Sequence, residues 1–308
     1  MAVAPRHEDR HRLLLEANAV AAAMPPLLVA ARRIAASVTL GSHGRRRAGV
    51  GDSFWQFRPY SKDDAPQSID WRQTAKFDHV FVREREWVAA QTAGLWCDTT
   101  ASMRYRSSPK LPTKAERAAV MMLALAELLV DGGERIIVLG NDGRPQRTAT
   151  AGRLAIAHLA DAMTADLTVR TLADDAPEMP SFSGALPRHS TAILFSDFLA
   201  PINVIAESLR SLMRTGVKGH LIQVLDPAEE TLPFSGRVRF VGLEREGAMV
   251  IDRTEDARAQ YMERLCAHRA ALKALAASSG WSFGLHHTDH SPQLAMAALH
   301  NAITSFRR

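Results

Sequence analysis

The 308-residue chain contains only two cysteines, Cys97 and Cys266, and they lie far apart in unrelated contexts. This count excludes a zinc cluster built on cysteine. Cys97 lies inside an apolar run and Cys266 inside a helical pattern, so we expect both to be reduced, buried thiols. Such cysteine usage suits a reducing compartment, and we expect a cytoplasmic protein.

The chain also lacks an apolar run long enough to cross a membrane. Its longest apolar tracts cover residues 17–31 and 119–130, of which the first is interrupted by Pro25-Pro26 and the second contains Glu127. A membrane helix requires roughly 18–20 consecutive apolar residues. The first dozen residues carry acids and are not followed by the apolar region of a signal peptide. We therefore expect a soluble protein without a membrane span.

Neither sign of charge dominates the chain, which carries 38 Lys and Arg against 33 Asp and Glu. The one concentrated basic patch, residues 41–49, contains the triplet Arg45–Arg47 and no interleaved aromatic side chain. It leaves weak nucleic-acid binding open as an alternative function. The motifs G-x-x-x-x-G-K-[ST], G-x-G-x-x-G and G-x-S-x-G are absent, so the sequence gives no support for nucleotide binding or a serine nucleophile.

Strand and helix patterns alternate over the last two thirds of the chain. Short apolar runs predict strands at 94–97, 135–140, 192–196, 219–225 and 281–287. Longer periodic segments predict helices at about 114–131, 152–165, 201–214, 254–278 and 292–306, the first opened by a capping box from Thr113 to Glu116. Residues 238–252 predict a hairpin. This alternation predicts an α/β fold with a mainly parallel sheet covered by helices on both faces.

The first 90 residues have a different character. Residues 10–38 predict a helix that Pro25-Pro26 breaks, and two alternating runs within 41–90 predict strands. We therefore divide the chain into an N-terminal helical segment (1–40), a β-rich extension (41–90) and an α/β domain (91–308).

Polar side chains follow two of the predicted strands. Asp98, Thr100 and Ser102 are spaced two residues apart after the strand at 94–97, and Ser196 and Asp197 lie at the carboxyl end of the strand at 192–196. Loops at the carboxyl ends of parallel strands carry the working groups of such sheets. Mg²⁺ and Mn²⁺ prefer carboxylate and hydroxyl oxygens in octahedral geometry. We expect Asp98, Thr100 and Ser102 to be ligands of such an ion, with Asp197 binding directly or through water.

Two further clusters have weaker claims to a function. Asp63, Asp64 and Asp70 form either a second acidic site or a turn that Trp71 anchors to the core, and Arg58, Arg72 and Arg83 are expected to form ion pairs with these acids. His286 and His290 have a zinc-like spacing only on a helix, whereas their segment predicts a strand that runs into a solvated loop.

The stretch "DTTAS" resembles the Asp-x-Ser/Thr-x-Ser metal-ion-dependent adhesion site of von Willebrand factor A domains. The preceding "FWQFRPYSKDDAPQSIDWRQTAKFDHVFVREREW" resembles the signature of a bacterial domain family of unknown function. The signature positions are Arg58, Tyr60, Asp63, Asp64, Ile69, Asp70, Trp71, Ala75, Lys76, Val82, Arg83 and Glu84. The resemblance spans roughly 41–290, with "AILFSDF" among its later segments.

The resemblance implies a von Willebrand A-like, Rossmann-like domain that works with a MoxR-type AAA+ ATPase in chaperone-like assembly or activation of clients. Adhesion-site domains usually add a threonine from an intermediate loop. Here Thr148 and Thr150 are the candidates, and Arg153 lies near the expected position.

We therefore expect a non-catalytic, divalent-metal-dependent interaction module, in which an open position on Mg²⁺ or Mn²⁺ receives an acidic side chain from a client or a partner ATPase. The alternatives are a metal-dependent hydrolase using Asp98 and Asp197 and a nucleic-acid binder using Arg45–Arg47.

Overall fold

The computed structural model describes residues 31–38, 54–61, 64–77, 79–85, 91–146, 148–169, 179–243 and 247–305. The chain divides into a large unit, Met1–Gly41 with Thr92–Arg308, and a small unit, Ser42–Gln91. Residues 31–38 are helical and contribute to the core of the large unit. The rest of the predicted N-terminal helix and the basic triplet Arg45–Arg47 lie outside the described residues.

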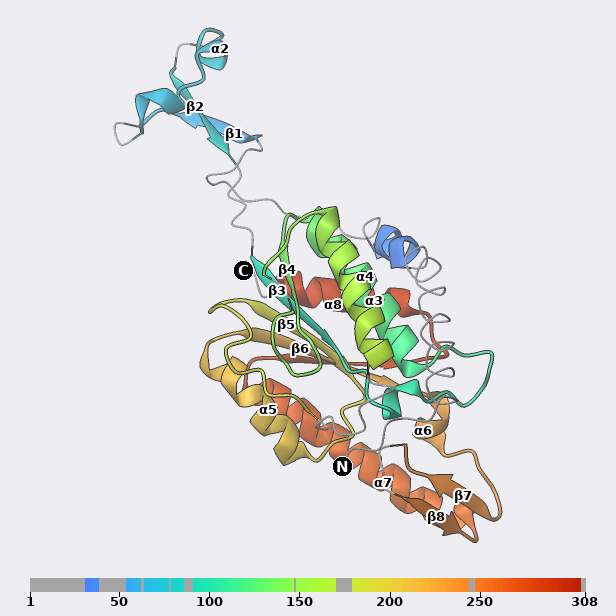
Figure 1. Ribbon diagram of the computed structural model, residues 1–308. Coiled ribbons are helices and arrows are strands. Elements are labelled where there is room, and N and C mark those ends of the chain that lie inside the picture. Colours follow the sequence, from blue (N-terminus) through green and yellow to red (C-terminus); the bar gives the residue numbers. More distant parts are fainter. Residues whose placement is uncertain are drawn as a thin grey trace. The chain divides into compact units, whose positions relative to one another are not determined.

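The large unit is built on five parallel strands. Their spatial order is β4 (Arg135–Val138), β3 (Thr92–Cys97), β5 (Thr191–Ser196), β6 (Lys218–Leu225) and β9 (Ser282–His287). Figure 1 shows the strands as one layer with helices on both faces. The predicted α/β fold, a Rossmann-like parallel sheet flanked by helices, is confirmed. In chain order the strands are arranged 2-1-3-4-5, which is one of the common doubly wound orders.

The central strands are apolar along nearly their whole length. In both β3 and β5, five of six residues are buried, because a parallel sheet has helices on both faces and neither face meets water. β3 lies between β4 and β5. The polar residues that follow β3 and β5 therefore stand next to each other at one edge of the sheet.

Helices of the large unit cover both faces of the sheet (Figure 1). One face packs against α3 (Lys114–Asp131), α4 (Arg153–Val169), α8 (Pro292–Ser305) and residues 31–38. The other face packs against α5 (Ile202–Arg214), α7 (Thr254–Ser278) and the segment 179–186. These contacts form two hydrophobic cores, one on each side of the sheet.

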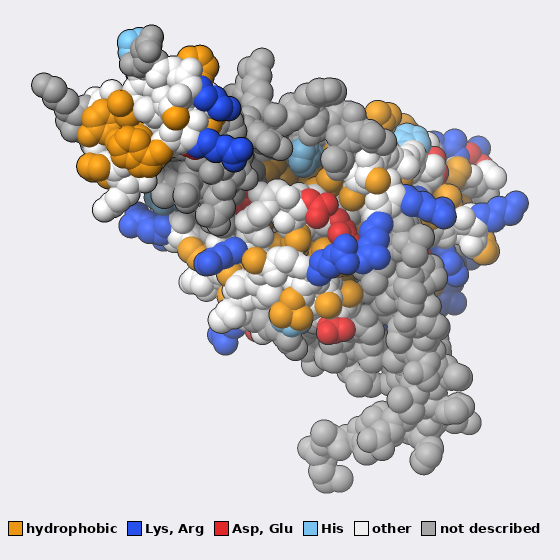
Figure 2. Space-filling model, turned by 90° about the horizontal axis from the view of Figure 1, so that it is seen from above, with side chains coloured by type: hydrophobic (Ala, Val, Ile, Leu, Met, Phe, Trp, Pro, Cys, Tyr) orange, Lys and Arg blue, Asp and Glu red, His pale blue; other side chains and the backbone are white. Residues whose placement is uncertain are grey.

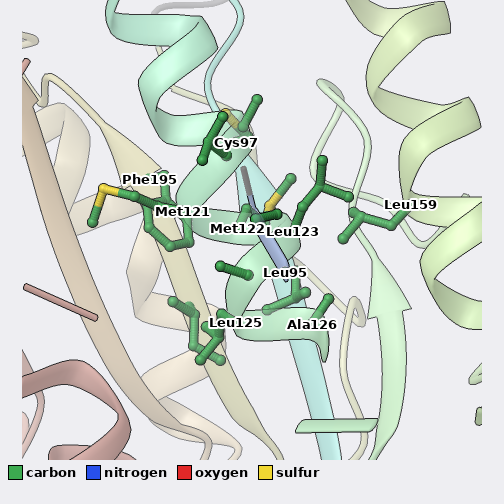
Figure 3. Packing of buried hydrophobic residues seen from close by; sticks show 14 of the residues in the cluster. Leu95, Cys97, Met121, Met122, Leu123, Leu125, Ala126, Leu159 and Phe195 are labelled. Carbon is green, nitrogen blue, oxygen red and sulfur yellow. The ribbon is translucent and has the colours of Figure 1, made fainter. Parts of the chain in front are cut away.

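Helix α3 is the most buried helix of the described part. Thr113 and Glu116 form the predicted capping box at its start, with both reciprocal bonds present. Figure 3 shows Met121, Met122, Leu123 and Leu125 of α3 within the core that also contains Leu95 of β3. Since 13 of its 18 residues are buried, α3 holds its first turn firmly against the carboxyl edge of the sheet.

Shorter elements complete both units. The large unit contains the turn η2 (Ser102–Arg104), the helix α6 (Pro227–Thr231) and an antiparallel hairpin of β7 (Val238–Val241) and β8 (Ala248–Ile251). The small unit contains an antiparallel pair of β1 (Phe54–Pro59) and β2 (Phe81–Arg85), with η1 (Pro66–Ser68) and α2 (Trp71–Thr74) between them. No helix in the described part of the chain is long and apolar enough to cross a membrane.

Two details differ from the sequence-based expectations. Cys266 is exposed and only Cys97 is buried, because Cys266 lies on a face of α7 that does not meet the sheet. Helix α6 was not predicted, since five residues are too few to show a period. It is nevertheless marked by a capping box from Asp226 to Glu229 with Pro227 at its first position.

Gly219 on β6 is required by close packing against Trp281. A Cβ atom at position 219 would lie 2.0 Å from Cε3 of that indole ring, and the indole N–H donates to the carbonyl oxygen of Val217 at 3.0 Å. We expect Gly219→Ala to lower the free energy of unfolding by about 1–3 kcal/mol or more. Urea unfolding measures the loss. Gly284→Ala is the control, because its Cβ would meet only the end of Ile222 at 3.1 Å. Equal stability of the two variants would contradict this packing.

Two buried histidines make the protein sensitive to acid. Burial lowers the pKa of His220 on β6 to about 4 and is the main cause that lowers the pKa of His286 on β9 to about 4. The folded state excludes a proton that the unfolded state binds near pH 6.5, so stability falls as the pH falls from about 6.5 to about 4. We expect His286→Gln to remove about 1–2 kcal/mol of the stability change between pH 7 and pH 5 in urea titrations. An unchanged pH dependence would contradict this.

Candidate metal centre

Four of the predicted ligands lie where the doubly wound sheet reverses its strand order. The chain passes from β3 to β4 on one side and returns to β5 on the other side of β3. Asp98 follows β3 and Asp197 follows β5, and the backbone N–H of Asp98 donates to the carbonyl oxygen of Phe195 at 2.8 Å. Sheets of this kind bind ligands in the crevice at such a switch point.

Asp98 is a buried carboxylate with a donor on each oxygen. The backbone N–H of Thr100 donates to Oδ1 at 2.8 Å, and the Ser196 hydroxyl donates to Oδ2 at 2.7 Å. Burial, and after it the charge of Asp197, raise the pKa of Asp98 to about 6. The side chain is therefore held in one orientation, while its negative charge is energetically costly.

Thr100 and Ser102 place two hydroxyl oxygens beside the buried carboxylates. Their Oγ1 and Oγ atoms are 3.1 Å apart. Both residues line a cavity of about 280 Å³ together with Asp98, Ser196 and Asp197. The cavity also has apolar walls, among them Met179 and Leu199. All four residues predicted as ligands thus meet at one cavity.

Asp197 is held by a lysine that sequence reasoning did not connect with the centre. Lys114, the first residue of α3, is fully buried and donates from Nζ to Asp197 Oδ2 at 2.8 Å and to Glu229 Oε1 at 2.5 Å. Burial lowers the pKa of Lys114, but the charges of Asp197 and Glu229 outweigh it and raise the pKa above its ordinary value. The other oxygen of Asp197 accepts from the backbone N–H of Leu199 at 3.3 Å.

The sequence contains a local signal at each of the two residues that were not predicted to lie near the centre. Lys114 directly follows the N-cap Thr113, and Glu229 is the last residue of the Asp226–Glu229 capping box. Neither signal shows that the two side chains meet. A lysine at the first position of a helix is nevertheless unusual, because the positive end of the helix dipole disfavours a cation there.

The expected threonine of an intermediate loop is not at the centre. Thr150 pairs with Ile136 near the start of β4, which is the end of the strand opposite to its carboxyl edge, and Thr148 lines a separate cavity there. The candidates Thr148 and Thr150 were therefore wrong, since the chain runs back along β4, with Pro145 beside Leu139 and Thr150 beside Ile136. The loop after β4 instead brings Asn141 near the centre, where its Oδ1 accepts from the Thr99 hydroxyl at 2.9 Å.

The signature residues of the small unit organise a turn. The Arg58 guanidinium binds both carboxylate oxygens of Asp64, and the Tyr60 hydroxyl donates to the Asp64 carbonyl oxygen at 3.2 Å. Asp70 caps α2 by accepting from the backbone N–H of Gln73 at 2.9 Å. Asp63 lies outside the described residues. These contacts are those of a rigid turn, and they leave Asp64 and Asp70 engaged.

Trp71 does not anchor this turn in a core, contrary to the expectation. Its side chain is 68% exposed, because it begins a helix of only four residues that presents its side chain to solvent. On the face shown in Figure 2, hydrophobic side chains gather on the small unit. Trp71 and Phe77 are among the exposed large hydrophobic residues there.

His286 and His290 lie in different environments. His286 is buried within β9, whereas His290 is exposed in the loop that follows. The predicted strand that runs into a loop is confirmed, with His286 on β9 and His290 in the loop. Among the described residues, no group of three His, Cys, Asp or Glu side chains is arranged to hold a metal ion. Any ion at the centre between β3 and β5 would depend on hydroxyl and water oxygens in addition to its carboxylates.

A family model described as "Protein of unknown function DUF58" matches residues 56–271, which is more than half of the chain. The chain belongs to the DUF58 family. The match includes the signature turn of the small unit and both loops of the candidate centre. No curated protein matches this DUF58 chain.

Solved structures resemble this DUF58 protein at low identity. The conserved hypothetical protein BatB from Bacteroides thetaiotaomicron is 14% identical, and an aerotolerance-related membrane protein from Bacteroides fragilis is 17% identical. Each comparison covers 70% of this chain and 100% of the other, with a TM-score of 0.41.

The charge of Asp98 destabilises the metal-free protein at neutral pH. Its folded-state pKa, about 6, is higher than the ordinary 3.8, so the folded state loses stability as the pH rises through this window. We expect Asp98→Asn to raise the free energy of unfolding of the EDTA-treated protein at pH 7 by about 1–3 kcal/mol. The exposed Asp161→Asn serves as control. A loss of stability in Asp98→Asn would contradict the result expected from burial and repulsion.

Proposed function

We propose that this DUF58 protein is a non-catalytic, divalent-metal-dependent protein-interaction module with a von Willebrand factor A-like domain. The observation that carries the proposal is the meeting of Asp98, Thr100, Ser102 and Asp197 at one cavity beside the β3–β5 switch point. These are hard oxygen donors, which suit Mg²⁺ or Mn²⁺.

The spacing of the two hydroxyls supports this ion. Adjacent ligands of an octahedral ion with bonds of about 2.0–2.1 Å lie about 3 Å apart, and the Thr100 and Ser102 oxygens are 3.1 Å apart. The same distance also permits the hydrogen bond that joins them without metal. Asp98 would hold the ion directly or through water. Asp197 would bind it through Oδ1, directly or through water, because Lys114 occupies its Oδ2.

A bound ion would change what the cavity attracts. The metal-free cavity carries two buried carboxylates, which repel an acidic partner. An ion that neutralises them, while keeping a water in an open position, can exchange that water for a partner carboxylate. A partner that binds only the metal-loaded form then shifts the population toward it by its differential affinity.

A MoxR-type AAA+ ATPase is the partner that we propose, in assembly or activation of client proteins. The support is the resemblance of residues 58–103 and the membership of the DUF58 family. The exposed Trp71 and Phe77 of the small unit are a second surface through which such an assembly could be held, since exposed aromatic side chains are frequent at protein interfaces.

A hydrolase is the less favoured function. Among the described residues that line the cavity, Asp98 and Asp197 are the only ionisable ones, and each already accepts hydrogen bonds within the protein. No His, Cys or Lys lines it as a base or nucleophile. Nucleic-acid binding depends on Arg45–Arg47, outside the described residues.

Metal binding is the first test of the proposed function. We expect MgCl₂ or MnCl₂ at millimolar concentration to raise the melting temperature of the wild type, because a ligand that binds only the folded state stabilises it. Asp98→Ala should abolish the rise, whereas the exposed Asp161→Ala on α4 should retain it. Calorimetry should give one ion per chain. No metal response in the wild type would reject the metal-dependent module.

Partner binding is the second part of the same test. A purified MoxR-type ATPase immobilised on a sensor should bind the wild type in Mg²⁺ and at least tenfold more weakly in EDTA, with Ser102→Ala weak in both. Equal binding in Mg²⁺ and EDTA would show that the metal does not control the interaction. Metal-dependent turnover of a generic phosphoester that Asp98→Ala loses would instead favour the hydrolase.

A further inference from the structure

Lys114 is a buried cation in an unfavourable place. Its side chain has no solvent exposure, and it is the first residue of α3, directly after the N-cap Thr113. The helix dipole is positive at this end, so it stabilises anions and disfavours a lysine. A buried charge also loses its hydration, and it persists only where nearby groups of opposite charge replace the water.

Two carboxylates from distant parts of the chain provide this replacement. Asp197 after β5 and Glu229 on α6 accept hydrogen bonds from Nζ at 2.8 and 2.5 Å. They lie 83 and 115 residues from Lys114 in the sequence. The ammonium group therefore ties together three elements: α3, the loop after β5, and α6.

The ammonium group takes a position that would suit a metal ion. Its nitrogen lies 2.8 Å from Asp197 Oδ2 and 2.5 Å from Glu229 Oε1. Two carboxylates completed by water are a frequent arrangement around Mg²⁺ and Mn²⁺. Asp197 thus belongs to both the Lys114 position and the cavity that contains Asp98, Thr100 and Ser102. A shared carboxylate of this kind is typical of two-metal sites.

We propose that Lys114 is a built-in cation that fills a second metal position, between Asp197 and Glu229, and thereby restricts the acidic centre to one divalent ion. This deepens the proposed function, since both concern the same centre. With Asp98, Asp197 and Glu229 in the centre and one lysine among them, a single divalent ion is enough to neutralise the remaining negative charge. The restriction also disfavours two-metal hydrolysis.

The test compares the number of Mn²⁺ ions per chain in the wild type and in Lys114→Ala, measured by calorimetry and by electron paramagnetic resonance. Alanine removes the charge and opens space for an ion with its water. We expect Lys114→Ala to bind one more Mn²⁺ than the wild type. The double variant Lys114→Ala/Glu229→Gln, which lacks one of the two carboxylates, should lose the additional ion.

Lys114→Ala leaves two carboxylates without their cation, so the metal-free variant is expected to unfold more easily than the wild type. Refolding from urea with and without MnCl₂ addresses this. We expect Mn²⁺ to raise the melting temperature of Lys114→Ala by more than it raises that of the wild type. A folded Lys114→Ala with the wild-type ion count would overturn the inference, and so would a variant that Mn²⁺ cannot restore to a folded state.

The two proposals fail in different ways. If the wild type binds no Mn²⁺ and Lys114→Ala binds one, the lysine does occupy a metal position but the proposed metal-dependent function is wrong. If the wild type binds one ion and Lys114→Ala also binds only one, the proposed function stands and the inference about Lys114 is wrong.

Discussion

The burial of negative charge at the carboxyl edge of the sheet is the constraint around which the centre is built. Asp98 and Asp197 are both nearly inaccessible to water, and two such carboxylates repel each other in an environment of low polarity. The protein compensates in part with hydroxyl and backbone donors on Asp98 and with the Lys114 ammonium on Asp197. The compensation is incomplete, because burial and the charge of Asp197 still hold the pKa of Asp98 above its ordinary value.

The fold makes this concentration of charge possible. Parallel strands bring the ends of β3 and β5 together, and the two hydrophobic cores hold the strands in register beneath them. The same packing positions Lys114, because the deeply buried α3 starts at the edge where both loops emerge. The stability of the cores thus supports a local arrangement that is itself unfavourable without a cation. In the function that we propose, this would be the physical basis for a switch between metal-free and metal-loaded forms.

The fold class followed from the sequence because apolar runs and helical periods are local signals. Strands such as β5 and helices such as α7 were predicted within one or two residues of their observed ends. The loops after β3 and β5 could be placed at one edge because parallel topology requires it.

Other features depend on contacts that no local pattern records. The Lys114–Glu229 pair joins residues 115 positions apart, so neither residue signals the other. Thr150 was assigned to the wrong end of β4, because a segment that turns back along a strand has the same composition as one that continues outward. Trp71 was expected to be buried on account of its residue type, whereas a one-turn helix leaves it exposed.

The most direct test of the account is the position of a bound ion. Crystals grown with MnCl₂ should show one anomalous scattering peak per chain in the cavity between β3 and β5. We predict bonds of about 2.0–2.3 Å from the ion to the hydroxyl oxygens of Thr100 and Ser102, with Lys114 still bound to Asp197. A peak that replaces the Lys114 contact, or a cavity without a peak at saturating manganese, would contradict the account.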